Sequence, residues 1–273
     1  MASQGTDWGA VADLVAGAES GGGVVGVSLI GPDGDRFTHR GDRRFRAAST
    51  VKIPIMVEIY RQIERGERAL DDPYTLRDDV KARGSGVLLH LHDGLTLTLG
   101  DLLYLMISIS DNTATNILID MAGMERVNAT MRDLGMTNST CERRMRGRRA
   151  EPGEPENWAA PGDYAAAVRA ILDHRAAAPS SCDAMTALLE KQQNHNRISR
   201  YLPEREGIRW GSKTGSIAGV TNDAGFITTD KGTLIVSVYC EGLPDQQTGE
   251  KVISDISRAA MAATGIVEPL YTS

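Results

Sequence analysis

The sequence has few cysteines, few aromatic residues and no long apolar run. Its 273 residues include three cysteines, Cys141, Cys182 and Cys240, and aromatic residues make up 5% of the chain. An odd number of widely spaced cysteines predicts reduced thiols, with neither a disulfide framework nor a metal site. No apolar stretch approaches the roughly 18 residues that a membrane helix requires, so the sequence predicts no membrane partner.

The chain also lacks an excess of positive charge. Thirty Lys and Arg residues stand against 36 Asp and Glu residues, which gives a net charge of −6. An acidic chain has little general affinity for nucleic acid, so we expect a small-molecule substrate. The opening residues, MASQGTDWGAVADLV, contain neither the basic segment nor the continuous apolar segment of a signal peptide. The sequence therefore predicts a cytoplasmic location, the alternative being a leader removed from the sequence given.

Strand patterns lie at both ends of the chain and helical patterns lie between them. GGGVVGVSLI and RFTHRG flank the turn GPDGD, and NDAGFITT and TLIVSVYCEG flank DKG, so we expect two hairpins. Thr6 is predicted to cap a first helix, Pro161 to start a later one, and Gly265 to end the last, at about 250–263.

These patterns predict an α/β (α+β) fold in two lobes. An antiparallel sheet would form from both termini and carry flanking helices, with an all-helical lobe inserted between its halves. We expect a single domain over 1–273, with a sheet lobe of 1–48 plus 205–273 and a helical lobe of 49–204.

One lysine stands in the apolar stretch AASTVKIPIM. On a helix, Lys52 shares a stripe with Met56 and Ile59, and Ser49 is its neighbour three residues earlier. Pro54 is tolerated only near a first turn, which places Ser49 at a helix N-terminus. A desolvated lysine loses charge readily and could take the serine proton. The alternative is a capping serine followed by a lysine whose ammonium reaches solvent.

Two further triplets follow in order, Ser-Asp-Asn at 110–112 and Lys-Thr-Gly at 213–215. With Ser-x-x-Lys they form the motif set of class A β-lactamases and penicillin-binding proteins. GSGVLLHLHDGLTLTLGDLLYLMISISDNTATNILID and QQNHNRISRYLPE also resemble that family. Over about residues 20–265 the chain resembles a class A β-lactamase-like serine hydrolase, which implies a β-lactamase-like two-lobed domain.

The resemblance implies catalytic roles for four residues. Ser49 would attack the substrate carbonyl and carry the acyl group, and Lys52 would help remove its proton. Ser110 would pass a proton toward the leaving nitrogen, close to the ammonium of Lys213.

Substrate contacts are implied in the same way. Asn112 would bind the amide side chain of the substrate, Thr214 with Lys213 would hold its carboxylate, and the backbone N–H groups of Ser49 and Ser216 would form the oxyanion hole. A helix N-terminus and a strand edge can both present such donors to developing negative charge. Asp111 is interpreted as a turn and cap residue.

The loop CERRMRGRRAEPGEPENWAAPGD departs from the class A pattern, in which a loop glutamate activates the deacylating water. Counting forward from DLGMTNST puts Met145 at that position, whereas the local match EPEN suggests another alignment. We follow the count, and Glu151, Glu154 and Glu156 remain candidates for a displaced base. Each is otherwise a solvated loop carboxylate.

Other features of the sequence bear on substrate and cofactor. Five arginines crowd the same loop, either as a solvated face or as an attractant for an acidic substrate or partner: Arg143, Arg144, Arg146, Arg148 and Arg149. Thr221 stands near where relatives often carry an arginine that holds the substrate carboxylate. His90 and His92 lack further ligands at metal spacing and are interpreted as helix-surface residues, so we expect no metal and no cofactor.

The sequence thus predicts a serine hydrolase that opens a β-lactam amide through an acyl-enzyme and deacylates slowly. An esterase or peptide amidase acting on an intracellular substrate is one alternative. A penicillin-binding or sensing module without turnover is another.

Overall fold

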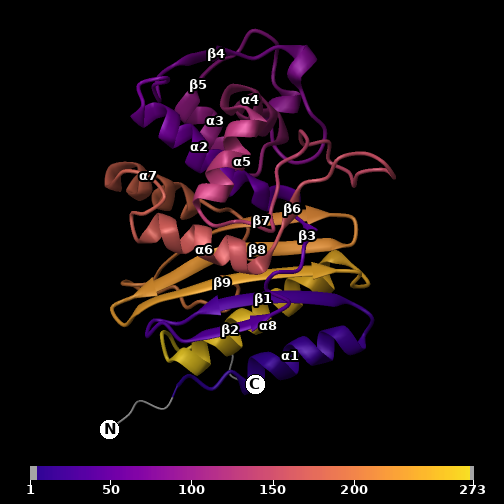
Figure 1. The fold of residues 1–273 in the computed structure, drawn as a ribbon, viewed down its shortest axis with the longest axis vertical. Helices are drawn as coiled ribbons and strands as arrows, with labels where there is room; N and C mark the ends of the chain where they lie inside the picture. Colours follow the sequence, from indigo (N-terminus) through magenta and orange to yellow (C-terminus); the bar gives the residue numbers. More distant parts are fainter. Residues whose placement is uncertain (1–4, 271–273) are drawn as a thin grey trace.

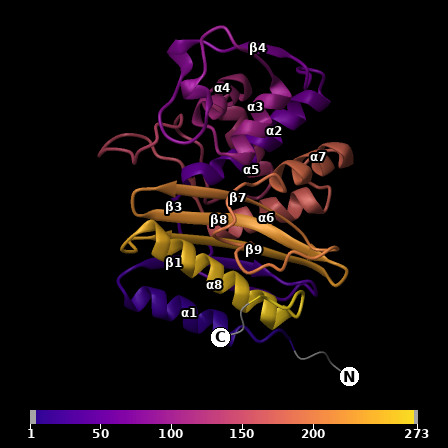
Figure 2. The same cartoon turned by 180° about the vertical axis from the view of Figure 1, so that it is seen from behind.

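The computed structural model describes residues 5–270 and is built around a five-stranded antiparallel sheet (Figures 1 and 2). The strand order is β2-β1-β9-β8-β7, and the bounds are β1 (Val24–Ile30), β2 (Arg36–His39), β7 (Arg209–Ile217), β8 (Val220–Thr229) and β9 (Gly232–Glu241). Because β1 pairs with β9, the two ends of the chain meet in the middle of the sheet. The two predicted hairpins, the antiparallel sheet and the two-lobed α/β fold are confirmed.

Helices cover both faces of the sheet. One face packs against α1 (Gly9–Ser20) and α8 (Gln246–Thr264), which lie side by side (Figure 2). The other packs against α6 (Pro161–Leu172). Alternation along β1 explains this layering, because Val25, Val27 and Leu29 face the α1–α8 layer. Between them Gly26 faces α6, where a Cβ would overlap the Phe45 ring.

The remaining helices form a layer above β7 (Figure 1). They are α2 (Lys52–Glu64), α3 (Leu99–Ser108), α4 (Asn112–Ala122), α5 (Met124–Asp133) and α7 (Pro179–Leu189), with short 3₁₀ turns η1 (Ala48–Val51), η2 (Asp78–Val80) and η3 (Leu88–His90). Two strand pairs, β3 (Phe45–Arg46) with β6 (Trp158–Ala159) and β4 (Pro73–Thr75) with β5 (Thr96–Thr98), complete the fold. No helix within residues 5–270 has the length and apolar character needed to cross a bilayer.

The helix signals in the sequence have mixed outcomes. Pro161 opens α6, and Gly265 ends α8 in the left-handed conformation, as predicted. The Thr6 cap is wrong, because α1 begins later and the Thr6 N–H instead donates to Asp35 Oδ2 at 2.6 Å. The last helix begins before residue 250, because Asp245 caps it through its carboxylate.

Candidate active site

Ser49 lies in the 3₁₀ turn η1, which continues directly into α2. Its side chain is almost buried at the junction between the helical layer and β7. Ala48 has a positive φ of 46°, which turns the chain sharply just before the serine. Gly215 makes the close approach of β7 possible, because a Cβ there would lie 2.9 Å from the Ala47 oxygen and 3.2 Å from the Ser49 nitrogen. The glycine of Lys-Thr-Gly therefore has a steric reason to be glycine.

Lys52 begins α2 and is completely buried. Its Nζ lies 2.8 Å from the Ser110 carbonyl oxygen, 2.8 Å from Ser110 Oγ and 3.1 Å from Asn112 Oδ1. These three contacts give the amine hydrogen-bond partners in place of water, which explains how it is tolerated in a fully buried position. The Ser-x-x-Lys and Ser-Asp-Asn segments thus meet at one buried nitrogen.

Burial also changes the protonation of two lysines. Desolvation lowers the pKa of Lys52 well below its usual range, and the nearby Lys213 charge lowers it further. Desolvation lowers the pKa of Lys213 to about 7, against the opposing effect of the Asp223 carboxylate, while Arg197 adds to the lowering. Burial therefore disfavours the charged form of both lysines.

The Ser-Asp-Asn segment is held in an unusual backbone conformation. Ser110 has a φ of 60°, which directs both its carbonyl and its hydroxyl oxygen at Lys52. Asp111 caps α4 by accepting from the Ala114 N–H, and its second oxygen accepts from the N–H groups of Val87 and Leu88. The structural interpretation of Asp111 is confirmed, and these bonds fix the strained turn.

Two neighbouring hollows share Ser49 as a lining residue, and together they are called the cleft. One, of about 320 Å³, contains Asn112 and the arginine-rich loop 143–148. The other, of about 670 Å³, contains Ser110, Thr214 and Arg197. Ser49 and Ser216 line both hollows. A substrate that spans the serine would therefore meet two chemically different sides.

Arg197 is a site residue that the sequence did not single out. It is fully buried under β7, where its guanidinium donates to the carbonyl oxygens of Gly215 and Asn222 and, at 2.5 Å, to Ser216 Oγ. It also pairs with Glu250 at 3.2 Å. The predicted departure at Thr221 therefore does not leave this side of the cleft without a guanidinium.

A family model described as the beta-lactamase enzyme family matches residues 9–264, nearly the whole chain. The chain belongs to this family. The resemblance to a class A β-lactamase-like serine hydrolase, drawn from three short motifs, is thereby confirmed, and the chain is a serine hydrolase of the β-lactamase type.

Individual members of the beta-lactamase family and related folds lie at different distances from this chain. A beta-lactamase structure from Sphaerobacter thermophilus is 62% identical, with a TM-score of 0.95 over 96% of this chain and 99% of that chain. Beta-lactamase CTX-M-97 from Escherichia coli is 29% identical over 247 residues, which are 89% of this chain and 83% of that protein. A mutant of PBP-A, described as an acyl-enzyme complex with penicillin G, is 25% identical, with a TM-score of 0.83 over 94% of this chain and 97% of that chain.

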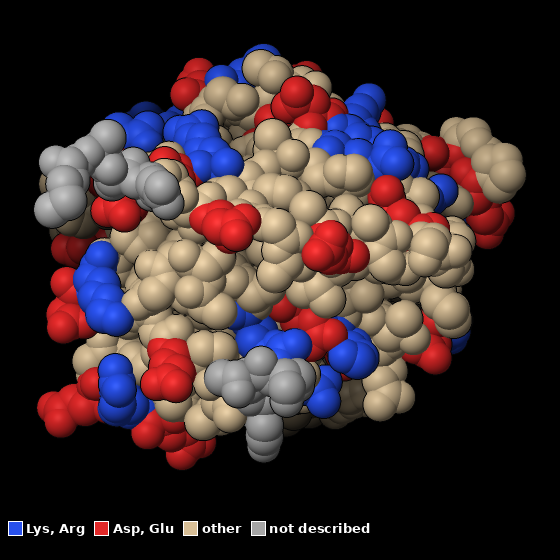
Figure 3. All heavy atoms as spheres, turned by 90° about the horizontal axis from the view of Figure 1, so that it is seen from below, with Lys and Arg blue, Asp and Glu red and all other residues tan. Residues whose placement is uncertain are grey.

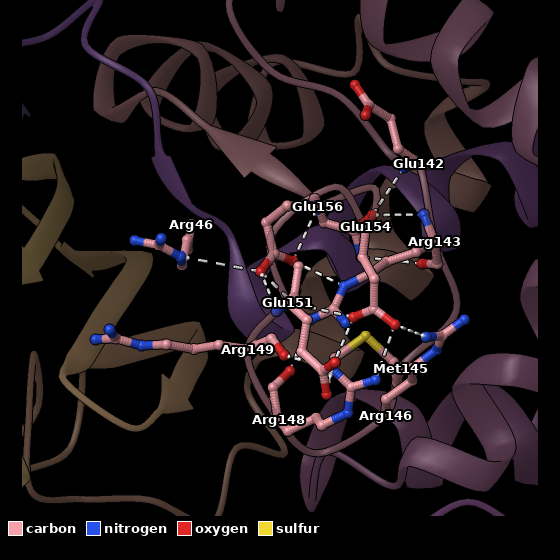
Figure 4. Close-up of polar contacts among 12 residues, drawn as sticks. Arg46, Glu142, Arg143, Met145, Arg146, Arg148, Arg149, Glu151, Glu154 and Glu156 are labelled. Atoms are coloured by element: carbon pink, nitrogen blue, oxygen red, sulfur yellow. Dashed lines mark hydrogen bonds and ion pairs between the residues drawn. The ribbon is translucent and has the colours of Figure 1, made fainter.

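Met145 occupies a well-defined place on the loop of this β-lactamase-like chain (Figure 4). Its N–H donates to Asn116 Oδ1 at 2.7 Å, and its carbonyl accepts from Asn116 Nδ2 at 3.0 Å. One amide on α4 therefore fixes both backbone groups of residue 145. Met145 is among the residues that line the smaller hollow with Ser49, and its side chain packs partly buried against the core. The count that puts Met145 where the class A loop glutamate would stand remains a prediction.

The three loop glutamates differ in their surroundings. Glu151 is exposed and pairs with Arg148 at 3.5 Å. Hydrogen bonds from Arg148 and from the Glu151 N–H, with the charge of Arg146, lower the pKa of the Glu154 carboxyl to about 2. Glu156 alone lines the hollow that contains Ser49. Its two oxygens accept from the guanidinium of Arg143 and from two backbone N–H groups, those of residues 150 and 157.

The larger surface hollow and the remaining candidate residues lie away from this chemistry. A hollow of about 1080 Å³ is lined by residues of α1, α8 and the segment 265–269, and no serine, cysteine or histidine is among its described lining residues. Figure 3 views the molecule from below, the side on which α1 and α8 lie. His90 ends η3, whereas His92 lies in an exposed loop, so the helix-surface interpretation is wrong for His92. Within residues 5–270 no three metal-ligating side chains cluster. The three cysteines are free thiols, as predicted, and all three are buried.

Proposed function

We propose that this chain opens β-lactam rings through an acyl-enzyme on Ser49 and releases the acyl group slowly. The observation that carries the proposal is the buried Lys52 amine, which lies one helical turn from Ser49 and contacts both Ser110 and Asn112. The family membership supports the substrate class, as does the acyl-enzyme that the PBP-A mutant forms with penicillin G.

In acylation, Ser49 Oγ bonds to the lactam carbonyl carbon and its proton passes to neutral Lys52. As the carbon–nitrogen bond breaks, the ring nitrogen takes a proton from the Ser110 hydroxyl, which Lys52 replenishes across their 2.8 Å contact. The developing oxyanion is stabilised by the backbone N–H groups of Ser49 and Ser216. The edge position of β7 supports this role, because one side of an edge strand is open to a ligand.

The two sides of the cleft orient the substrate. The substrate carboxylate lies on the side of Thr214, where the charges of Lys213 and of Arg197 behind Ser216 attract it. The acyl amide lies on the side of Asn112, against the loop that carries Met145. This orientation follows from the positive charge buried beneath one side and the amide group on the other.

Deacylation lacks a positioned base in this scheme. A thioether at residue 145 cannot accept the proton of an attacking water. Loss of a general base commonly slows a step by about 10²–10⁴. The same observation favours a second candidate function, a penicillin-binding module that acylates once and does not turn over.

Mass spectrometry of the intact protein tests the proposal. After mixing with benzylpenicillin, the adduct mass should reach one equivalent and then decline slowly as product forms. Ser49→Ala should prevent labelling and leave the circular dichroism spectrum unchanged. Persistent labelling of Ser49→Ala contradicts the assignment of Ser49 as the nucleophile. An adduct that never declines supports the penicillin-binding module. Rapid turnover without an adduct contradicts slow deacylation.

A further inference from the structure

Four of the five loop arginines already neutralise a carboxylate. Their partners are Glu156 for Arg143, Asp120 for Arg144, and Glu154 for both Arg146 and Arg148. Arg149 differs from them, because no carboxylate within residues 5–270 lies at ion-pair distance from its guanidinium. Figure 4 shows its side chain directed away from the glutamates.

The Arg149 guanidinium lies instead against the turn between β7 and β8. A Cβ built on Gly219 would overlap Arg149 Nη2, so the missing side chain of Gly219 provides the space for the guanidinium. Arg148 and Ile217, near neighbours of these two residues in the chain, line the Ser49 hollow. The exposed Arg149 side chain is not itself among the residues that line this hollow, but it lies between the loop and the β-turn beside it.

The Glu154 carboxylate on this loop is not free to pair with Arg149. Glu154 is shared by two arginines, and because the pKa of its carboxyl is about 2 it remains ionised and committed to them at neutral pH. An arginine without a partner at the edge of a hollow is a ready site for a carboxylate, which its planar fork matches.

We propose that Arg149 selects substrates whose acyl side chain ends in a carboxylate. The inference rests on the proposed function, because that function places the acyl side chain in the hollow that contains Asn112 and the loop. It names a substrate subclass, penicillins acylated with a dicarboxylic acid, and a residue that determines the preference.

A matched substrate series tests the inference. Penicillins made from succinic, glutaric and adipic acid are each compared with their own methyl ester, so that only one charge differs within a pair and the length sets the reach. The rate constant for Ser49 acylation at low substrate concentration is measured for each. The best carboxylate should exceed its ester by about fivefold, as expected for a partly exposed ion pair.

Two variants separate a contact from a general field. Arg149→Gln should reduce the preference to about one. Arg36→Gln removes the same charge from an exposed arginine on β2, at the opposite edge of the sheet from β7, so it should leave the preference near its original value. The assignment is overturned if the preference survives in Arg149→Gln or is equally lost in both variants. It is also overturned if the unmodified protein shows no preference.

Failure of the proposed function would look different. If no penicillin labels Ser49, the same acyl groups are presented as p-nitrophenyl esters, which any nucleophilic serine can accept. A charged-ester preference that depends on Arg149 then supports this inference while the β-lactam proposal falls. Absence of acylation by both series overturns both.

Discussion

Replacing Met145 by glutamate should convert a slow acyl-enzyme into one that turns over. The backbone of residue 145 is fixed at both its N–H and its carbonyl by Asn116, so a new side chain starts from the same place. Residue 145 is among the residues that line the hollow containing Ser49, so we expect a carboxylate there to meet a water beside the ester. A general base typically accelerates such a step by about 10²–10⁴.

Met145→Gln is the matched control for this substitution. Glutamine has the shape of glutamate and can hydrogen-bond to water, but it cannot take a proton. Deacylation is followed by the decay of the acyl-enzyme mass after excess penicillin is removed, and acylation is measured separately by its appearance. We expect decay to be at least about 100 times faster in Met145→Glu than in Met145→Gln, with acylation changed far less. Equal decay in the two variants would refute the reasoning that residue 145 governs deacylation.

Three further predictions concern the acylation machinery. Lys52→Ala should slow Ser49 acylation by about 10²–10⁴, and an unchanged rate in a stopped-flow assay would mean that the amine only packs. The pKa of Lys213 is lowered to about 7, so the lysine loses its charge as pH rises through that value. We therefore expect kcat/KM for an anionic substrate to fall above pH 7. Lys213→Arg stays charged, so its kcat/KM should not fall in this pH range. Gly215→Ala should push β7 away from η1 and slow acylation. In Gly17→Ala the new Cβ meets nothing within 4 Å, so this control should leave acylation unchanged and raise the free energy of unfolding by about 0.5–1 kcal/mol.

The sequence predicts the parts of the fold and site that depend on local patterns. The two hairpins follow from alternation and turn residues, and the burial of Lys52 follows from its place on an apolar helical stripe. The first helix start fails because Thr6 has a distant partner, Asp35, that no local rule can reveal. Local chemistry thus gives the elements, while capping choices also depend on what the folded chain brings near.

Contacts between distant segments explain what the sequence does not predict. Arg197 is one arginine among many in the sequence. Its role in the site is visible only in the fold, where it contacts Ser216 and Glu250. The link between Asn116 and Met145 likewise joins α4 to a loop 29 residues away. Neither contact has a spacing signature, because the loop between the partners sets no fixed register.

Glu156 shows why proximity alone does not supply a deacylation base. It lines the hollow of Ser49, but its carboxylate is engaged by Arg143 and by two backbone N–H groups. Using it as a base requires separating it from a guanidinium, and breaking a buried ion pair commonly costs about 3–5 kcal/mol. A general base contributes about 10²–10⁴ in rate, which corresponds to about 3–5 kcal/mol of barrier. The cost of freeing the carboxylate is as large as the gain from using it, so we expect Glu156 to stabilise the loop and not to serve as the deacylation base.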